Sequence, residues 1–320
     1  MPSAHLDTGA EAVNSSRASV GRWRRYWRGL APLRVRIIVS RFRRQLPGAV
    51  PWCIAAAHRG AIRLTRRLLP YRAGRRMVAL LIESLTPDST VVTKTRHGSV
   101  KFYCPGAMPF KRSVVAEDDT LAWIEGFSEG DVLWDVGANV GEYTVPAAAR
   151  GLRVWAFEPA AVNFFVLARN VELNQFGDRI TALNVALHDR SEIGALWMEH
   201  TQIGSSHHMF GGSTTNSACP TTVPLHRQAV VGYTIDDLIK TFDTEFPNHI
   251  KLDVDGNEAV ILRGARRTLA EPRLSSLLIE VRNDTREQVL QLMHEAGFAS
   301  PRQLRLKPRS GLADLLFTRG

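Results

Sequence analysis

Val132-Leu-Trp-Asp-Val-Gly-Ala-Asn-Val-Gly141 is the stretch that decides the fold, because an apolar run ending in Asp135 is followed at once by glycines at 137 and 141. Glycine lets a backbone turn approach a ligand where a side chain would collide, so the spacing predicts a strand, a ligand-contacting loop and a helix. A second apolar run, Val154-Trp-Ala-Phe-Glu158, ends in another carboxylate. Its place roughly 20 residues further on is where such folds hold the hydroxyls of a ribose. The two runs therefore predict a nucleotide pocket.

The number of glycines indicates which nucleotide is bound. A dinucleotide site has three glycines, as G-x-G-x-x-G, to admit a pyrophosphate at a helix N-terminus. Gly137-Ala-Asn-Val-Gly141 has only two. The loop favours S-adenosylmethionine, whose charged amino-acid tail suits a carboxylate such as Asp135. Two alternatives stay open: an NAD-dependent oxidoreductase, disfavoured by the missing glycine, and a strand-to-helix turn without a ligand.

Basic residues are concentrated at the beginning of the chain. The net charge of the 320 residues is +10, but residues 1–76 hold seventeen Arg against Asp7 and Glu11, a net of +15, which leaves −5 for the rest. The high isoelectric point therefore does not predict nucleic-acid binding by the remainder. A nucleic-acid-binding protein or methyltransferase that uses the basic N-terminal region is kept as an alternative. Against it, Asp253-Val-Asp-Gly256 stands where a flipped-base enzyme would carry an Asn-Pro-Pro-Tyr type motif.

The N-terminal region is predicted as two segments. Residues 1–20 are polar and small, which is typical of a disordered tail. Residues 21–85 alternate Arg with Trp, Leu, Ile and Val and are interrupted by prolines, as in basic amphipathic helices. This extension can lie on an anionic bilayer, be solvated, or serve as an organelle transit peptide.

Cysteine spacing and hydropathy indicate the cellular compartment of the protein. Three widely separated cysteines, Cys53, Cys104 and Cys219, give no disulfide or metal framework, and no apolar run reaches the roughly 20 residues of a membrane span. The predicted location is cytoplasmic, with contact to the inner face of the membrane through residues 21–85 as an open possibility.

Strands and helices alternate along the rest of the chain. Residues 90–104 predict a β-hairpin and Glu117 to Phe127 a helix. The predicted strands that follow are 131–136, 153–157, 180–186, 249–254, 275–281, 302–306 and 313–318, and the helices are 142–150, 160–175, 234–242, 257–270 and 284–296, with a less regular stretch from 187 to about 228. This order predicts a mostly parallel sheet covered on both faces. Four acids at or beside strand ends should then gather on one rim, namely Asp135, Glu158, Asp253 and Glu280.

Several ordered motifs carry a family resemblance. Asp135-Val-Gly-Ala-Asn-Val-Gly141, Ala156-Phe-Glu-Pro159, Asn184-Val-Ala-Leu187, Thr234-Ile-Asp-Asp-Leu238 and Ile250-Lys-Leu-Asp-Val-Asp-Gly256 resemble the FkbM-type S-adenosylmethionine-dependent methyltransferases. The resemblance covers roughly residues 90–318 and is specific. It implies a methyltransferase domain over residues 86–320, with the hairpin as its lead-in.

The resemblance also implies a fold and an activity. The fold is a class I, Rossmann-like, doubly wound α/β sheet of seven strands with an antiparallel last strand. The activity is transfer of a methyl group to a hydroxyl of a sugar, glycolipid or natural product. Carried over residue by residue, the cofactor-binding positions are Asp135, Gly137, Asn139 and Gly141 at the methionine end, Glu158 at the ribose, and Ala186 and Leu187 at the adenine. Family members often have Glu where this chain has Asp255, which makes a ligand role for this shorter side chain less secure.

Asp253 is the candidate catalytic residue. The methyl group of S-adenosylmethionine is already activated, so the protein must align an oxygen behind it, and an alcohol benefits from a general base. Asp253 ends the strand predicted beside the glycine-loop strand, although a turn or helix-capping carboxylate is the alternative. His249 begins the same strand and would lie at the wrong edge.

The polar stretch His200 to His226 predicts an acceptor-binding loop. One of its histidines could act as the base instead of Asp253. The histidine spacing has no metal-ligand signature, so no metal is predicted; a divalent ion held with Asp253 and Asp255 remains the alternative.

Overall fold

The structure is a computed structural model that describes residue 60 and residues 90–104, 118–206, 208–211, 226–307 and 311–319. The chain divides into two compact units, Met1–Pro87 and Asp88–Gly320. The predictions for residues 1–20 and 21–85 lie outside the described residues, apart from Gly60. Within the described part, no helix combines the length and apolarity needed to cross a membrane.

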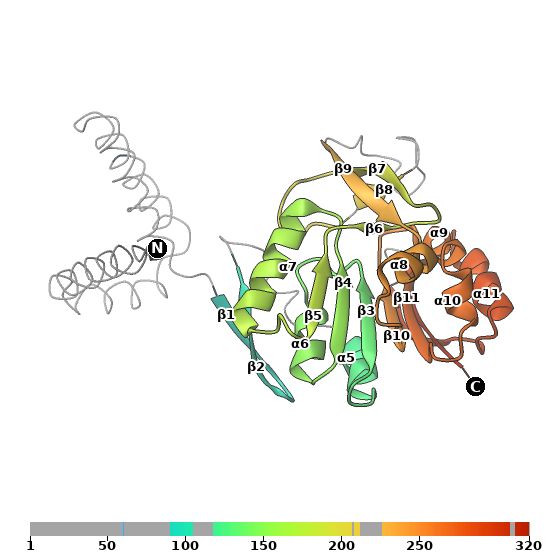
Figure 1. Cartoon of the computed structure of the whole chain (residues 1–320), viewed down its shortest axis with the longest axis horizontal. Coiled ribbons are helices and arrows are strands. Elements are labelled where there is room, and N and C mark those ends of the chain that lie inside the picture. Colours follow the sequence, from blue (N-terminus) through green and yellow to red (C-terminus); the bar gives the residue numbers. More distant parts are fainter. Residues whose placement is uncertain are drawn as a thin grey trace, which may run out of the picture. The chain divides into compact units, whose positions relative to one another are not determined.

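The central sheet has seven strands (Figure 1). Their bounds are β3 Val132–Val136, β4 Arg153–Phe157, β5 Ile180–Leu183, β10 His249–Leu252, β11 Ser276–Arg282, β12 Arg302–Lys307 and β13 Leu312–Thr318. Their order is β12-β13-β11-β10-β3-β4-β5. Strands from β5 to β11 run parallel, whereas β13 runs antiparallel to both of its neighbours. The predicted class I arrangement, with an antiparallel last strand, is confirmed.

Helices cover both faces of this sheet (Figure 1). Side chains alternate across a strand, so neighbouring residues enter different cores. Trp134 and Ile250 belong to the core beneath α8 Ile235–Phe242, α9 Glu258–Arg263, α10 Arg266–Ala270 and α11 Arg286–Glu295. Leu133 and Val154 belong to the core beneath α5 Asp118–Glu125, α6 Thr144–Ala149 and α7 Ala161–Asn174. The strands read as continuous apolar runs because both faces are buried.

The predicted hairpin is present as β1 Thr90–Thr95 and β2 Gly98–Tyr103. Asparagines on α7 hold it by its main chain. Asn174 accepts a hydrogen bond from the Lys101 amide (2.8 Å) and donates one to the Lys101 carbonyl (2.7 Å). Asn170 likewise accepts from the Tyr103 amide (2.6 Å). Helix α7 therefore positions a segment that is not part of the central sheet.

A second sheet occupies the stretch predicted to be irregular. It consists of β6 Ala186–Leu187, β7 Glu192–Met198, β8 His208–Phe210 and β9 His226–Tyr233, in the order β6-β9-β7-β8. The predicted strand 180–186 is confirmed only over Ile180–Leu183, because the chain then leaves the central sheet and joins this second one. Gly194 and Gly232 make room inside this sheet, because a Cβ on either would come within 2.6 Å of the Phe210 ring. Glycine is usually a turn signal, but here it makes room for an aromatic ring.

The predicted helix 257–270 is wrong as a single helix, since α9 ends before Gly264 and α10 begins after Ala265. A Cβ at Gly264 would lie 2.3 Å from the His188 carbonyl oxygen, so glycine is needed there. Asp236 accepts hydrogen bonds from the amides of Arg267 and Thr268, both at 2.9 Å, and so caps α10. This residue of the Thr234–Leu238 motif is therefore structural.

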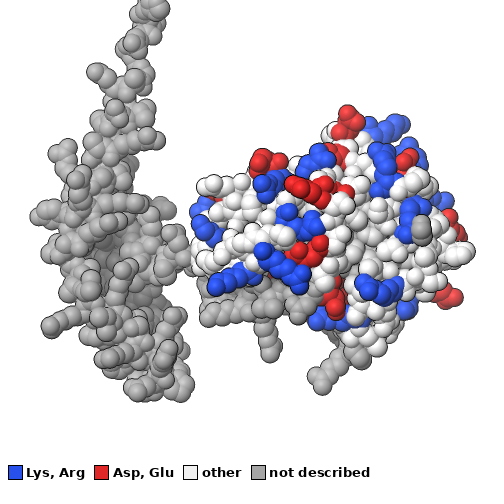
Figure 2. All heavy atoms as spheres, turned by 90° about the horizontal axis from the view of Figure 1, so that it is seen from below, with Lys and Arg blue, Asp and Glu red and all other residues white. Residues whose placement is uncertain are grey.

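Figure 2 shows one face of the described unit, on which Lys and Arg side chains are interspersed with Asp and Glu. A nucleic-acid-binding domain typically gathers its basic side chains in one patch or stripe. This face therefore gives no support to the nucleic-acid alternative.

Candidate active site

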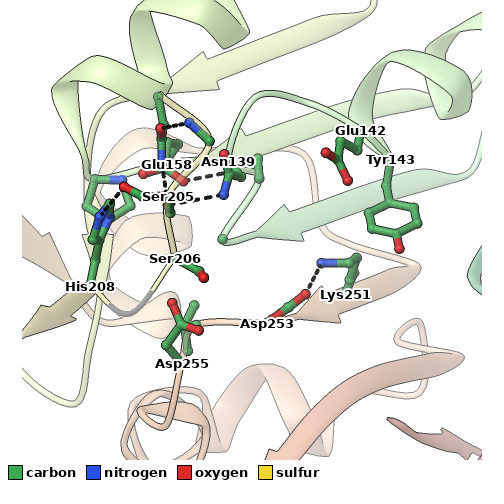
Figure 3. Close-up of a pocket in the computed structure, with 16 residues that line it drawn as sticks. Asn139, Glu142, Tyr143, Glu158, Ser205, Ser206, His208, Lys251, Asp253 and Asp255 are labelled. Carbon is green, nitrogen blue, oxygen red and sulfur yellow. Dashed lines mark hydrogen bonds and ion pairs between the residues drawn. The ribbon is translucent and has the colours of Figure 1, made fainter. Parts of the chain in front are cut away.

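A cavity of about 260 Å³ lies at the carboxyl ends of β3, β4 and β10. Parallel strands present these ends at one edge, where ligands bind in such sheets. The walls come from five segments: the loop after β3 (137–139, 142 and 143), the residues after β4 (158 and 159), Asn163 of α7, the end of β10 with its turn (251 and 253–255), and the β7–β8 connection (204–206) with the first residue of β8 (208). Figure 3 shows Glu158 and Asn139 on one side of this cavity and Lys251 and Asp253 on the other.

The two glycines of the loop are required by the protein's own packing. Gly137 has a φ of 81°, and a Cβ there would lie 1.8 Å from the Asp253 carbonyl oxygen. Gly141 has a φ of 90°, and its Cβ would lie 2.8 Å from Leu167 Cδ1. The sequence predicts that both glycines make room for a ligand. The structure adds a packing reason, because Gly137 admits the β10 turn and Gly141 admits helix α7.

Glu158 is fixed at one end of the cavity by backbone amides. Asn139 has a φ of 51°, a left-handed conformation that Asn tolerates, and its amide donates to Glu158 Oε2 at 2.8 Å. The Ala160 amide donates to Oε1, also at 2.8 Å. Each carboxylate oxygen can accept a second hydrogen bond. The Asn139 Oδ1 atom is buried and has no hydrogen-bond partner among the described residues, so it too can accept a bond from a ligand.

The surroundings of Glu158 shift its acidity. Burial raises the pKa of Glu158 to about 7, although the amides of Ala160 and Asn139 lower it, and the nearby carboxylates of Asp255 and Asp135 raise it further. The side chain therefore changes charge near neutral pH.

At the opposite end of the cavity, Lys251 lies between two carboxylates. It stands beside Asp135 in the register of β10 and β3, and it is 5% exposed. Its Nζ atom lies 3.1 Å from Asp253 Oδ2, 3.8 Å from Asp135 Oδ1 and 4.8 Å from the centre of the Tyr143 ring. Burial disfavours the charge, but the carboxylates of Asp253 and Asp135 outweigh it and hold the Lys251 pKa above its usual value. Lys251 is therefore a fixed cation under the cavity.

The turn that carries Asp253 is held from below by Glu258. Asp255 and Gly256 both have positive φ, 58° and 115°, and Glu258 Oε1 accepts a hydrogen bond from the Gly256 amide at 2.9 Å. Burial raises the pKa of Glu258 to about 7, with backbone bonds from the turn opposing the shift. Asp253 does not cap the following helix, whose N-cap is Asn257. Its side chain instead reaches Lys251.

The β7–β8 connection forms the wall beside Glu158. The Ser205 carbonyl accepts hydrogen bonds from Asn163 Nδ2 (3.1 Å) and Asn139 Nδ2 (3.4 Å). His208 Nε2 lies 3.1 Å from Ser205 Oγ. His208 thus lines the cavity, whereas His200 and His226 do not, and His207 lies outside the described residues. The described part of the chain holds no group of three or more His, Cys, Asp or Glu arranged for a metal ion.

The predicted site residues fall into three groups. Gly137, Asn139, Glu158 and Asp253 line the cavity. Ala186 and Leu187 line a smaller adjoining cavity of about 30 Å³, together with Gly137 and Pro159. Two predicted residues, Asp135 and Gly141, line neither of these cavities.

Asp135 lies below the rim because its side chain is fully buried. It accepts a hydrogen bond from Thr144 Oγ1 at 2.6 Å. Glu280 is also away from the main cavity and lines a separate one that shares Tyr143, Lys251 and Asp253 with it. His249 lies at the start of β10, 2.7 Å from Ser276 Oγ. Of the four acids predicted to gather on one rim, only Glu158 and Asp253 therefore line the main cavity.

Two residues that line the cavity were not identified from the sequence. Lys251 is a lone charge in the apolar run of β10, and Asn163 is one of three asparagines at 163, 170 and 174. Their spacings of 7 and 4 put these asparagines on one face of a helix. Both features are signals in the sequence, since a buried charge or amide requires a partner.

A family model and one known protein match the sequence of this chain. The family model described as "Methyltransferase FkbM domain" matches residues 135–300, just over half of the chain. The hexuronic acid methyltransferase AglP of Haloferax volcanii is 27% identical over 190 residues, which are 59% of this chain and 72% of that protein.

Solved structures of methyltransferases are also similar. Methyltransferase FkbM from Methylobacillus flagellatus KT is 22% identical, with a TM-score of 0.41, over 60% of this chain and 44% of the other. Magnesium protoporphyrin IX methyltransferase from Synechocystis PCC 6803, with bound S-adenosylmethionine, is 12% identical, with a TM-score of 0.39, over 66% of this chain and 80% of the other. The match of the family model over residues 135–300, on a seven-stranded sheet of the expected topology, shows that the chain belongs to the FkbM family of S-adenosylmethionine-dependent methyltransferases.

Proposed function

We propose that this protein transfers the methyl group of S-adenosylmethionine to a hydroxyl of a sugar, glycolipid or natural product, with Asp253 as the general base. The observation that carries the proposal is the arrangement of two acids at opposite sides of one cavity. Glu158 is bonded by loop amides, and Asp253 is bonded by the buried Lys251.

The charge of the cavity supports this donor over a dinucleotide. Four carboxylates line it, those of Glu142, Glu158, Asp253 and Asp255. Among the described lining residues Lys251 is the one Lys or Arg, and it already lies beside Asp253 and Asp135. Such a site repels the pyrophosphate of a dinucleotide and attracts a sulfonium and an ammonium group. The oxidoreductase alternative is therefore not favoured by the charge or by the family.

Residues at the Glu158 side fit the nucleoside of the donor. Glu158 has acceptor capacity left for two ribose hydroxyls, and the buried Asn139 Oδ1 atom can accept another bond. A cavity of about 260 Å³ is near the low end of the ~300–1,000 Å³ of small-molecule sites. It therefore suits one nucleoside-sized ligand, and the acceptor must meet it at the mouth.

Asp253 is placed to take a proton. S-adenosylmethionine supplies, when bound, a methyl group activated by its sulfonium charge. The acceptor oxygen forms the new bond to this methyl group, the carbon–sulfur bond breaks, and the hydroxyl proton passes to Asp253. Lys251 fixes the orientation of this carboxylate through the 3.1 Å contact. Proton transfer by a positioned carboxylate typically contributes about 10²–10⁴-fold to the rate.

One comparison supports a sugar acceptor. The similar AglP protein is named a hexuronic acid methyltransferase, which makes a carbohydrate acceptor the first class to try.

The test is transfer of label to extracted acceptors. Purified protein is incubated with tritium-labelled S-adenosylmethionine and with glycan and glycolipid fractions from cells that lack it. We expect label in a carbohydrate fraction, and a roughly 100-fold slower transfer by Asp253→Asn with unchanged donor affinity. A protein that binds the donor but labels no fraction, or an Asp253→Asn variant as fast as the wild type, would contradict the proposal.

Contact with the inner face of the membrane through residues 21–85 and a cytoplasmic location stay predictions, since that segment lies outside the described residues. Removing residues 1–85 should abolish sedimentation with anionic liposomes. Unchanged sedimentation would refute the membrane contact.

A further inference from the structure

We propose that residues 202–206, here called the strap, form one wall of the donor site and that Asn163 is the positioning residue that holds them there. The strap lies between β7 and β8 of the second sheet, far along the chain from the glycine loop and from Glu158. This inference rests on the proposed function, because it concerns how the same cavity binds its donor.

Asn163 clamps the strap by its main chain. Its side chain is 1% exposed, in the first turn of α7. Asn163 Oδ1 accepts a hydrogen bond from the Gly204 amide at 2.8 Å, and Nδ2 donates to the Ser205 carbonyl at 3.1 Å. A single amide thus satisfies both a donor and an acceptor of the strap. Because it is buried, each of its polar atoms would be costly to leave without a partner.

The strap has further fixed points. Ile203 packs against the apolar cluster that contains Val140, Val145 and Val166. Gly204 has a φ of 74°, which a residue with a Cβ rarely adopts. Ser205 Oγ donates to the Gln202 carbonyl at 2.7 Å, closing a turn. The strap therefore has a defined conformation that depends on the clamp at its middle.

Hydrogen bonds connect Asn163 to the Glu158 side of the cavity. The Ser205 carbonyl also accepts a bond from Asn139 Nδ2, and the Asn139 amide donates to Glu158. Figure 3 shows Ser205 beside Asn139 and Glu158, and Asp253 on the other side of the cavity. Loss of the clamp should therefore weaken donor binding at the Glu158 side without changing the contact between Lys251 and Asp253.

The same helix offers a matched control. Asn174 clamps Lys101 of the hairpin in the same manner, with its side chain bonded to one amide (2.8 Å) and one carbonyl (2.7 Å). Asn174 does not line the cavity. Asn163→Ala and Asn174→Ala thus remove equivalent hydrogen bonds from α7, but only the first releases the strap.

The experiment measures binding of S-adenosylhomocysteine by calorimetry, which needs no acceptor. We expect Asn163→Ala to raise the dissociation constant about tenfold or more, equal to about 1.4 kcal/mol, and Asn174→Ala to leave it within about twofold. Asn163→Asp keeps the acceptor for Gly204 but, as a carboxylate, loses the donor to Ser205, so it should also weaken binding. Equal affinity of wild type, Asn163→Ala and Asn163→Asp, or equal losses in the Asn163 and Asn174 variants, would overturn the inference.

Hydrogen exchange of the ligand-free protein tests the clamp itself. The Gly204 amide should exchange about tenfold faster in Asn163→Ala than in the wild type. Unchanged exchange would show that Asn163 does not hold the strap. A wild-type protein that binds no S-adenosylhomocysteine, yet shows the expected exchange, would instead refute the proposed function and leave the clamp intact.

Discussion

The two sides of the cavity hold their acids by different means. At the end of β4, Glu158 accepts hydrogen bonds from two backbone amides and forms no ion pair with any described residue. At the end of β10, Asp253 is bonded by the ammonium group of Lys251, which also faces Asp135. The first acid therefore changes charge near pH 7, whereas the second is tied to a permanent cation. Under the proposed function, the first side binds the ligand and the second accepts the proton.

Gly137 joins the two sides, because its loop contacts Glu158 through Asn139 and the β10 turn directly. Gly137→Ala should have the largest effect, since the new Cβ would lie 1.8 Å from a backbone oxygen at a φ of 81°. We expect a loss of at least about 5 kcal/mol in the free energy of unfolding, enough to unfold many domains.

Gly151→Ala is the control for this prediction, because Gly151 has a φ of 103° but no atom within 4 Å of its Cβ position. It should lose only about 1–2 kcal/mol, the cost of the left-handed conformation. Equal losses in the two variants, measured by denaturant unfolding, would show that the contact with the β10 turn is unimportant.

Removing the buried cation tests the β10 side. Lys251→Met leaves Asp135 fully buried without its cation, which should cost about 3–5 kcal/mol in the free energy of unfolding. The double variant Lys251→Met with Asp135→Asn should recover a large part of this loss. A double-mutant cycle in urea would measure the coupling, and simple additivity of the two changes would contradict the pairing.

The stability of the protein should depend on pH through Glu158. The pKa of Glu158 in the folded protein, about 7, lies above the ordinary value of 4.5. The contribution of this carboxyl group to stability is therefore complete below about pH 4.5 and is lost as the pH rises through 7. The stability of the wild type relative to Glu158→Gln should therefore fall by up to about 3 kcal/mol between pH 4.5 and pH 8. A flat difference across this window would show that burial does not shift this carboxyl group.

The same ionisation should be linked to donor binding. Ribose hydroxyls donate to the ionised carboxylate, so below pH 7 each bound donor should release one proton and the affinity should fall about tenfold per pH unit. Calorimetry in buffers of different ionisation enthalpy measures this release. Proton release that persists in Glu158→Gln would assign it to another group.

The smallest expected effect is at Tyr143, whose ring centre lies 4.8 Å from Lys251 Nζ. Tyr143→Leu should lower the free energy of unfolding by about 1–2 kcal/mol, because the ammonium loses the face of an aromatic ring. Tyr143→Phe keeps the ring and should lose less. If the two variants are equally stable, the ring contributes little to holding the cation.

Local signals explain which features could be predicted from the sequence. The central sheet could be predicted because its strands are short apolar runs between helices. Glu158 could be predicted because it ends one of those strands at a fixed distance from the glycine loop. The second sheet could not be predicted, because it depends on contacts between distant segments, such as the packing of the Phe210 ring on Gly194 and Gly232. A contact to a distant aromatic ring leaves no local trace.

The remaining site residues depend on distant parts of the chain. Lys251 meets Asp135 only through the register of β10 and β3, and Asn163 meets Ser205 across 42 positions. Asp135 was expected on the rim because it ends the apolar run, but its partners Thr144 and Lys251 keep it below. Its role in the proposed site is therefore to position Lys251.

A crystal structure with S-adenosylhomocysteine tests the central claim most directly. We predict that the ribose hydroxyls lie about 3 Å from the Glu158 carboxylate, beside Asn139 and the strap, and that the sulfur atom faces Asp253. A ligand bound elsewhere, or one whose ribose lies away from Glu158, would contradict the assignment of the two sides.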